Sequence, residues 1–399
     1  MIEQLRLSRR ASQVAPSSTM AAAAAARALA EKGVSVVNLT AGEPDFATPE
    51  PIRKAAHDAI EAGYTKYPPL TGYGDLRQAV AEAAAARGFH VDPEGVVVSC
   101  GAKQAITNAL LALVDQGDEV IVPAPYWVSY VDQVKLVGGT PVVVETRAAD
   151  GFALDPALLA AAVTPRTVAI FVNSPCNPTG AVYDRGSLEA VAELAVRHDL
   201  WVLSDEIYAA LTYEGEAVSF GSISPEAARR TVLIDGVSKS FAMTGWRIGW
   251  TACDTRLAKA IAVMQGQTTS GATAISQRAA LAALRMDRAP VQAMVAEYHK
   301  RRDYGIERLN AIPGISCAKP VGAFYFFPHV SGLLGRSHQG TVIDSAATLT
   351  RLLLEREGLA IVGGDGFGAP EYVRISYAAS MASLAEGFDR LERFVRALS

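Results

Sequence analysis

Short apolar runs recur through the middle of the chain between longer amphipathic stretches. The apolar runs predict strands at residues 95–99, 119–122, 141–144, 168–172, 201–203, 231–234 and 247–252. Apolar residues at helical spacing predict helices at 104–114 and 187–198. Continuously apolar strands that alternate with helices are typical of a parallel sheet covered on both faces, which indicates an α/β fold.

The last hundred residues show a different pattern. Two stretches, 314–327 and 371–377, have the composition of sheet, and the basic cluster of Lys300, Arg301 and Arg302 is expected on a solvated helix face. Helical spacing predicts helices at 290–309, 345–357 and 383–398. This mixture suggests a smaller α+β domain, which the N-terminal segment with its Ala-rich helix joins.

A chain of 399 residues is too long for one ordinary core, so we expect two domains, one interrupting the other. We place the large domain at 49–290, and the small domain at 1–48 together with 291–399. The formal net charge of −4 gives no indication of a nucleic-acid or anionic-membrane surface.

The four cysteines share no metal-like spacing, so no metal site is expected and reduced thiols are the simplest account. Residues 1–10 lack the apolar core of a signal peptide, and no apolar run reaches membrane-spanning length. We therefore expect a cytoplasmic protein.

Five candidate chemical residues lie just after predicted strands: Lys103, Trp127, Asn177, Asp205 and Lys239. Ligands of parallel sheets bind beyond the carboxyl ends of the strands, so these residues are expected at one site.

Lys239 stands among small and hydroxyl residues, and Arg247 follows eight positions later between Gly245 and Gly249. A lysine in such a setting can form a Schiff base with an aldehyde, and a guanidinium can bind phosphate through a planar fork of donors. The pair indicates pyridoxal 5′-phosphate (PLP), a phosphorylated aldehyde. The alternative is a lysine on a solvated loop, against which partners for the other parts of PLP argue.

The phosphate of PLP needs hydrogen-bond donors that no bulky side chain covers. Gly101, Ala102 and Lys103 follow a strand and open a helix, where backbone N–H groups and the helix dipole suit a dianion. Arg247 supplies side-chain charge and Ser238 a hydroxyl. A glycine before a helix is common, so this signal is weak by itself.

The pyridine ring calls for three further partners. A buried carboxylate keeps its nitrogen protonated, and Asp205, after an apolar strand, suits that role. Tyr208 lies one helical turn later, and both Tyr208 and the amide of Asn177 suit the 3′-oxygen. The alternatives are an N-cap role for Asp205 and a plain turn around Asn177.

Two more residues complete the set. Trp127 can stack on the ring, although a lone tryptophan is more often core filler. Arg374, in a strand-like apolar segment, suits the α-carboxylate of a substrate through a bidentate pair, with a structural salt bridge as the alternative.

With these residues in place, the chain resembles a class I aminotransferase of PLP fold type I. It is most similar to the bacterial aspartate aminotransferases, a group that includes prephenate aminotransferases. The resemblance covers nearly the whole length. It rests on the segments 41–46, 64–72, 173–180, 204–208, 238–249 and 373–377.

The resemblance implies a mostly parallel seven-stranded sheet sandwiched by helices, plus a smaller α+β domain from both termini. It implies that Lys239 is the Schiff-base lysine and proton shuttle, and that Gly42 lies close to Arg374 and the substrate. Tyr67 would reach the phosphate of a neighbouring subunit, so the active unit would be a homodimer with shared sites. In some relatives a serine of the phosphate site stands where this chain has Gly236.

The resemblance also implies that Lys103 and Thr19 contact the distal carboxylate of aspartate or prephenate. The alternatives are that Thr19 caps the Ala-rich helix and that Lys103 faces solvent. The implied reaction is ping-pong transamination between an L-amino acid of the aspartate or glutamate type and a 2-oxo acid. Three other hypotheses remain: an aminotransferase for another substrate, a PLP β- or γ-lyase, and a PLP-binding regulatory domain without turnover.

Overall fold

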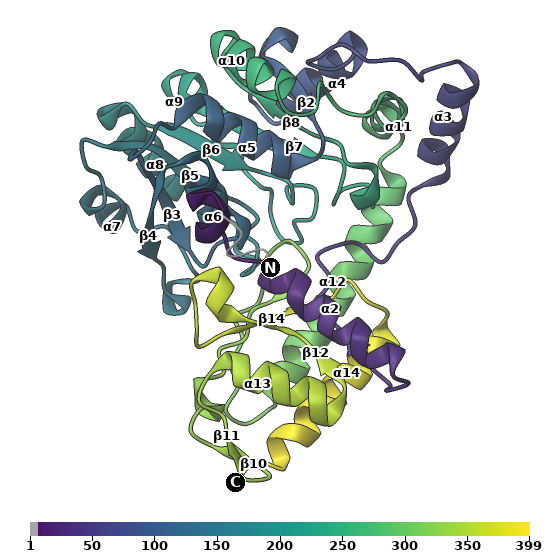
Figure 1. Ribbon diagram of the computed structural model, residues 1–399, viewed down its shortest axis with the longest axis vertical. Coiled ribbons are helices and arrows are strands. Elements are labelled where there is room, and N and C mark those ends of the chain that lie inside the picture. The colour runs from purple at the N-terminus through teal and green to yellow at the C-terminus, as the bar shows by residue number, and fades with distance from the viewer. Residues whose placement is uncertain (1–6) are drawn as a thin grey trace, which may run out of the picture.

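The computed structural model describes residues 7–399, and its centre is a seven-stranded sheet in the upper part of Figure 1. The strand order is β2-β8-β7-β6-β5-β3-β4, and β8 alone runs antiparallel to its two neighbours. The strands are β2 (Val96–Ser99), β3 (Glu119–Ala124), β4 (Thr140–Glu145), β5 (Thr167–Asn173), β6 (Trp201–Asp205), β7 (Thr231–Gly236) and β8 (Gly249–Ala252). The predicted mostly parallel, seven-stranded sheet is confirmed, and each predicted strand is present with small shifts of its ends.

Helices cover both faces of this sheet, as its side-chain alternation requires. Leu203 and Val232 pack on the side of α5, α6 and α10, whereas Val202 and Leu233 pack on the opposite side, where α4, α8, α9 and α11 lie. The helices are α3 (Glu50–Glu61), α4 (Gly74–Ala85), α5 (Ala102–Leu113), α6 (Ser129–Val137), α7 (Pro156–Ala161), α8 (Arg185–His198), α9 (Pro225–Arg230), α10 (Thr255–Gly266) and α11 (Ala274–Arg285).

The lower part of Figure 1 combines both ends of the described chain. The short strand β1 (Val37–Asn38) pairs in parallel with β12 (Leu359–Ala360), so the N-terminal segment joins the C-terminal elements. A three-stranded antiparallel sheet has the order β13-β14-β9. The other elements are β9 (Tyr325–Phe326), β10 (Ser337–His338), β11 (Thr341–Val342), β13 (Val362–Gly363), β14 (Val373–Ser376), α2 (Ser18–Glu31), α12 (Ala289–Asn310), α13 (Ala346–Leu352) and α14 (Met381–Arg396). The short helix α1 (Arg9–Gln13) instead lies beside α6 of the upper part.

Sheet over the whole of 314–327 is a wrong prediction, because only Tyr325–Phe326 forms a strand there. Gly314 and Ala323 both have positive φ, +83° and +58°, and Pro320 has no N–H to donate. These residues turn the backbone away from a continuous ladder.

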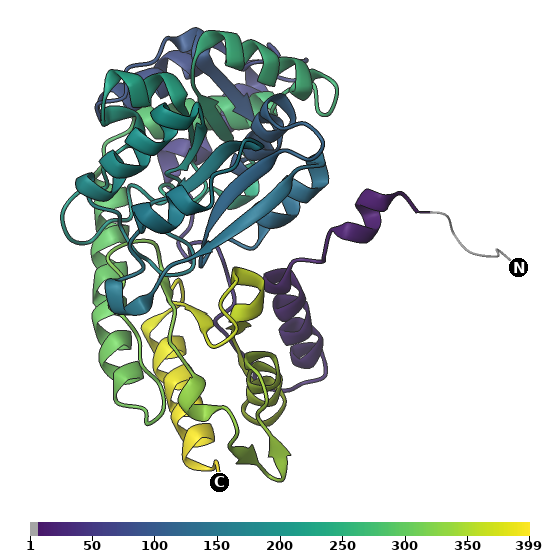
Figure 2. The same cartoon turned by 90° about the vertical axis from the view of Figure 1, so that its left-hand side faces the viewer.

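The long helix α12 runs along both the upper and the lower part of the molecule (Figure 2). The expectation of a solvated basic face is wrong for two of its three residues, since Arg301 is 6% exposed and Arg302 is fully buried. Arg302 forms an ion pair with Glu214, and Arg301 forms one with Asp45 at 2.8 Å. Because neighbouring segments cover this side of α12, the two arginines are buried and paired, whereas Lys300 remains exposed.

No helix within residues 7–399 is both long enough and apolar enough to cross a membrane.

The contact between α12 and its neighbours gives a stability prediction. A Cβ at Gly305 would lie 2.3 Å from Phe326 Cζ, and Phe326 is fully buried. Gly305→Ala should therefore destabilise the fold by about 1–3 kcal/mol, despite the better helix propensity of alanine. Urea unfolding measures the change.

Gly186→Ala is the matched control, because Gly186 also lies in a helix but has only Asp184 Oδ1, at 3.7 Å, near an added Cβ. It should stabilise the protein by about 0.4–1 kcal/mol. Equal stabilisation by both variants would contradict the tight packing of α12 on β9.

Candidate active site

The carboxyl ends of β5 and β6, the start of α5 and the turn after β7 enclose a cavity of about 260 Å³. Parallel strands bring these ends together, so residues far apart in sequence meet there. Predicted site residues that line it are Thr19, Gly42, Ala102, Lys103, Trp127, Asn177, Asp205, Tyr208, Ser238, Lys239, Arg247 and Arg374. Two other predicted residues, Gly101 and Tyr67, are not among its lining residues.

Lys239 follows β7 and its amine donates a hydrogen bond to the carbonyl of Gly42. Burial lowers the pKa of the Lys239 amine to about 8, and the nearby Arg374 guanidinium acts in the same direction. The amine forms no ion pair within the described residues. A lysine in this state can give up its proton near neutral pH, as a nucleophile or a proton carrier requires.

Asp205, the last residue of β6, is 3% exposed and forms no ion pair with the described part of the chain. Its Oδ2 accepts a hydrogen bond from Tyr130 Oη at 2.6 Å, and its Oδ1 accepts one from the N–H of Ile207 at 3.2 Å. Burial raises the pKa of Asp205 to about 6, whereas the Tyr130 hydrogen bond lowers it. A buried carboxylate of this kind can pair with a cationic group of a ligand.

Arg374, on β14, is 1% exposed and has no carboxylate partner among the described residues. Its Nη1 donates to Asn177 Oδ1 at 3.1 Å and its Nη2 donates to the carbonyl of Thr40 at 2.9 Å, while Nε has no partner. The guanidinium lies over the Tyr325 ring, 4.4 Å from its centroid. Residues 7–399 thus provide no structural salt bridge for Arg374, which was the alternative interpretation, and the geometry suits binding of an anion.

Arg247 and Gly101 pack against each other at the start of α5. Gly101 caps the helix with φ +85°, and a Cβ there would lie 2.7 Å from Arg247 Nη2. Gly101 thus lies beneath the guanidinium and does not line the cavity itself. With the free N–H groups of the first helical turn, Arg247 and Ser238 form a donor set that fits a phosphate.

Lys103 is an exposed residue, as one alternative had it, but its amine also has partners at the cavity. Its Nζ donates to Ser129 Oγ at 2.9 Å and lies 4.9 Å from the centre of the Trp127 ring. Burial lowers the pKa of Lys103, and Arg247 acts in the same direction. Thr19, which lines the same cavity, has a buried Oγ1 with no hydrogen-bond partner among residues 7–399, so this oxygen can bind a ligand.

Tyr67 is 94% exposed and does not reach this cavity. Gly236 lines a different cavity, on the α4 side of the sheet, and a Cβ there would lie 2.8 Å from the carbonyl of Ile248. The described residues contain no group of His, Cys, Asp and Glu side chains that could hold a metal ion.

Three further residues of the site were not predicted from the sequence. Tyr130 binds Asp205 and lies one helical turn after Trp127, a spacing that offered a signal. Asn173 Nδ2 donates to the carbonyl of Asp205 at 2.9 Å from the end of the neighbouring strand. Tyr325 Oη lies 2.8 Å from Tyr208 Oη, and no local sequence motif indicates that Tyr325 belongs to the site.

Comparisons with known proteins agree with this geometry. The family "Aminotransferase class I and II" matches residues 34–391. The aspartate aminotransferase of Geobacillus stearothermophilus is 42% identical over 98% of this chain and 100% of its own length. The aspartate/prephenate aminotransferase of Thermus thermophilus is 45% identical over 98% of each chain.

Solved structures show the same fold. The Thermus thermophilus aspartate aminotransferase with maleate superposes with a TM-score of 0.92 at 43% identity, over 98% of this chain and all of that one. The aspartate aminotransferase of Rhizobium meliloti gives a TM-score of 0.95 at 39% identity, over 99% of this chain and all of that one. The chain therefore belongs to the class I and II aminotransferases, as a PLP-dependent class I enzyme of fold type I.

Proposed function

We propose that this aminotransferase moves the amino group of aspartate or glutamate to a 2-oxo acid, using the residues of the 260 Å³ cavity. One observation carries the proposal: Lys239 lines one cavity together with the buried side chains of Asp205 and Arg374, and none of the three forms an ion pair within the described residues. Burying unpaired charge is unfavourable, so a ligand of complementary charges is expected there.

The donor set fits PLP part by part. Asp205 would hold the ring nitrogen, Tyr208 and Asn177 the ring oxygen, and Trp127 one ring face. The phosphate would take the backbone N–H groups of Ala102 and Lys103 and the side chains of Ser238 and Arg247, above Gly101. When bound, PLP supplies an electron sink for the bond broken at the substrate Cα.

The remaining steps belong to side chains of this chain. Arg374 would bind the substrate α-carboxylate through a bidentate pair and so orient the Cα–H bond toward Lys239. Lys239, as a neutral amine, would take that proton and return it on the cofactor side. The Tyr325–Tyr208 hydrogen bond would keep the Tyr208 hydroxyl in place.

The distal carboxylate of a dicarboxylic substrate would lie between Lys103 and Thr19. Lys103 supplies charge and the unpartnered Thr19 hydroxyl supplies direction. Relatives named aspartate aminotransferase and aspartate/prephenate aminotransferase support this choice, and the second name keeps prephenate as an alternative acceptor. Product analysis separates transfer, which gives a new amino acid, from β- or γ-elimination, which releases ammonia.

A homodimer is part of the proposal. Tyr67 is 94% exposed and lies outside its own cavity, as expected of a residue that reaches the phosphate site of a second copy. The domain boundaries at 48/49 and 290/291 and a cytoplasmic location remain predictions.

Lys239→Ala should remove the visible absorbance band of the PLP-loaded protein and lower kcat by at least about 10²–10⁴-fold, because the proton carrier is lost. Lys259→Ala, at an exposed position on α10, is the control and should retain both. Turnover of the Lys239 variant at the wild-type rate would refute the assignment.

Lys103→Met should lower kcat/KM for aspartate by about 10–100-fold, because a charge-assisted hydrogen bond contributes about 1.5–3 kcal/mol. The same variant with alanine as amino donor is the internal control, since alanine has no distal carboxylate. Equal losses with both donors would show that Lys103 does not read the distal group.

Tyr130→Phe removes a hydrogen bond that stabilises the charged form of Asp205, so the pKa of that carboxyl should rise. The acidic limb of the kcat/KM profile should therefore move to higher pH. Tyr183→Phe, at another buried tyrosine, serves as control and should leave the limb in place. A limb that moves down or stays fixed in the Tyr130 variant would be inconsistent with this role.

A further inference from the structure

Arg87 bridges a buried and a partly buried carboxylate on the α4 side of the large sheet. Its Nη1 lies 3.0 Å from Glu206 Oε2 and its Nη2 lies 3.2 Å from Asp235 Oδ2. The side chain of Glu206 is 3% exposed and that of Asp235 is 18% exposed. A guanidinium can bind two such groups at once through the fixed geometry of its planar fork, which the compact ammonium of a lysine does not reproduce.

The two carboxylates belong to the segments that carry the proposed chemistry. Glu206 directly follows Asp205 at the end of β6, and Asp235 lies in β7, four residues before Lys239. Successive side chains of a strand point to opposite faces, so Asp205 lines the catalytic cavity while Glu206 meets Arg87 on the other side.

Both carboxylates are also fixed by hydrogen bonds. Glu206 Oε1 accepts bonds from Ser204 Oγ at 2.8 Å, Ser219 Oγ at 3.0 Å and the N–H of Phe220 at 3.0 Å. Asp235 Oδ1 accepts the N–H of the next residue at 2.7 Å. Each side chain is thus locked to its own segment, and Arg87 connects the two.

Arg87 itself is held by the end of α4. Its N–H and that of Phe89 both donate to the carbonyl of Ala84 at 3.0 Å, and Gly88 between them has φ +83°. Because these bonds fix the backbone at the end of the helix, the Arg87 guanidinium is held beside the ends of β6 and β7.

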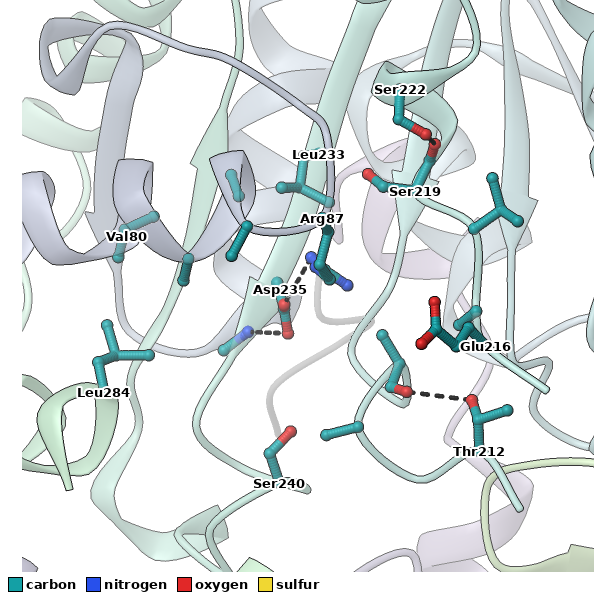
Figure 3. A pocket seen from close by; sticks show the side chains of 18 of the residues that line it. Val80, Arg87, Thr212, Glu216, Ser219, Ser222, Leu233, Asp235, Ser240 and Leu284 are labelled. Carbon is teal, nitrogen blue, oxygen red and sulfur yellow. Dashed lines mark hydrogen bonds and ion pairs between the residues drawn. The ribbon is translucent and has the colours of Figure 1, made fainter. Parts of the chain in front are cut away.

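Figure 3 shows Arg87 and Asp235 pointing toward each other in a cavity of about 730 Å³, beside Leu233 and Ser219. Ser240 lines this larger cavity, whereas Ser238 and Lys239 line the catalytic one. The segment after β7 therefore separates the two cavities.

We propose that Arg87 is a positioning residue for transamination, which by bridging Glu206 and Asp235 fixes the two strand ends that carry Asp205 and Lys239. The inference rests on the proposed roles of those two residues. Arg87 also offsets the negative charge of two carboxylates directly behind the site. Its loss would leave that charge uncompensated and would loosen the connection between β6 and β7.

The charges support an electrostatic readout. Burial raises the pKa of Asp235 to about 7, and Arg87 opposes that rise. Glu206 raises the pKa of Asp205, so the Arg87–Glu206 pair affects the catalytic carboxyl across the sheet. The other charged groups that line the larger cavity are Arg185, Glu216 and Arg288.

The test uses the PLP-loaded full-length protein and the variants Arg87→Met, Arg87→Lys and Asp235→Asn. Arg87→Met should lower kcat for aspartate about tenfold or more, with KM changed less than about threefold, because displaced catalytic groups slow the chemical step. Arg87→Lys should keep most of the charge effect and still lose kcat, because a compact ammonium does not reproduce the spacing and orientation of the guanidinium fork.

The pH midpoint of the visible absorbance gives the decisive sign. Removing a cation favours the protonated form of the absorbing group, so Arg87→Met should move the midpoint up. Asp235→Asn removes an anion that is ionised above a pH of about 7, so it should move the midpoint down. A purely structural role would not produce opposite shifts from the two halves of one ion pair.

Arg308→Met is the matched control. Arg308 is 27% exposed against 25% for Arg87, and it also faces two carboxylates, Asp389 and Glu392, on α14. It should lower stability without changing the midpoint or kcat. If Arg87→Met does not fold, Arg87→Lys and Asp235→Asn decide the question through kcat and the midpoint.

Midpoints that stay fixed or move in the same direction, with kcat as in Arg308→Met, would overturn the inference while leaving the proposed function intact. A wild-type protein that shows no visible band with PLP would instead overturn the proposed function, and this inference with it.

Discussion

The structure depends on the unfavourable burial of unpaired charge at one edge of the large sheet. Lys239, Asp205 and Arg374 lie in a low-dielectric cavity without ion-pair partners among the described residues. The protein keeps them there because backbone carbonyls and neutral side chains hold each one in place: Gly42 for the lysine, Tyr130 for the aspartate, Asn177 for the arginine. Such a site is prepared for a ligand that brings both charges.

The topology explains how so few residues achieve this. Parallel strands deliver Asn173 and Asp205 to the same edge, and helix α5 begins where β2 ends, so its free N–H groups face the same space. Arg374 comes from β14, far along the chain, and its guanidinium donates to the carbonyl of Thr40 in the N-terminal segment. Both ends of the chain thus contribute to one site, and the core supports the site from two directions.

Much of this was predictable because it follows from local pattern. The apolar runs predicted all seven strands. Residues at or just after the ends of these strands, such as Asp205 and Lys239, could therefore be expected at one site before the fold was known. Long-range partners could not be found in this way. The pairing of Tyr325 with Tyr208 joins residues 117 positions apart, and no local spacing encodes it.

The burial of Arg302 could not be predicted from the sequence for a related reason. A cluster of basic residues is expected on a solvated face unless the segment that covers it is known. Sequence pattern reports which face of an element is apolar, whereas the pairing of polar groups depends on what packs against the other face.

The ion pair between Arg301 and Asp45 has a mechanical consequence. Asp45 lies three residues after Gly42, whose carbonyl accepts the hydrogen bond of Lys239, and the same N-terminal segment holds Arg374 through Thr40. A displacement of this short segment would therefore shift the acceptor of the lysine and the acceptor of the carboxylate-binding arginine together, so that the positions of two functional groups from distant parts of the chain are coupled through it.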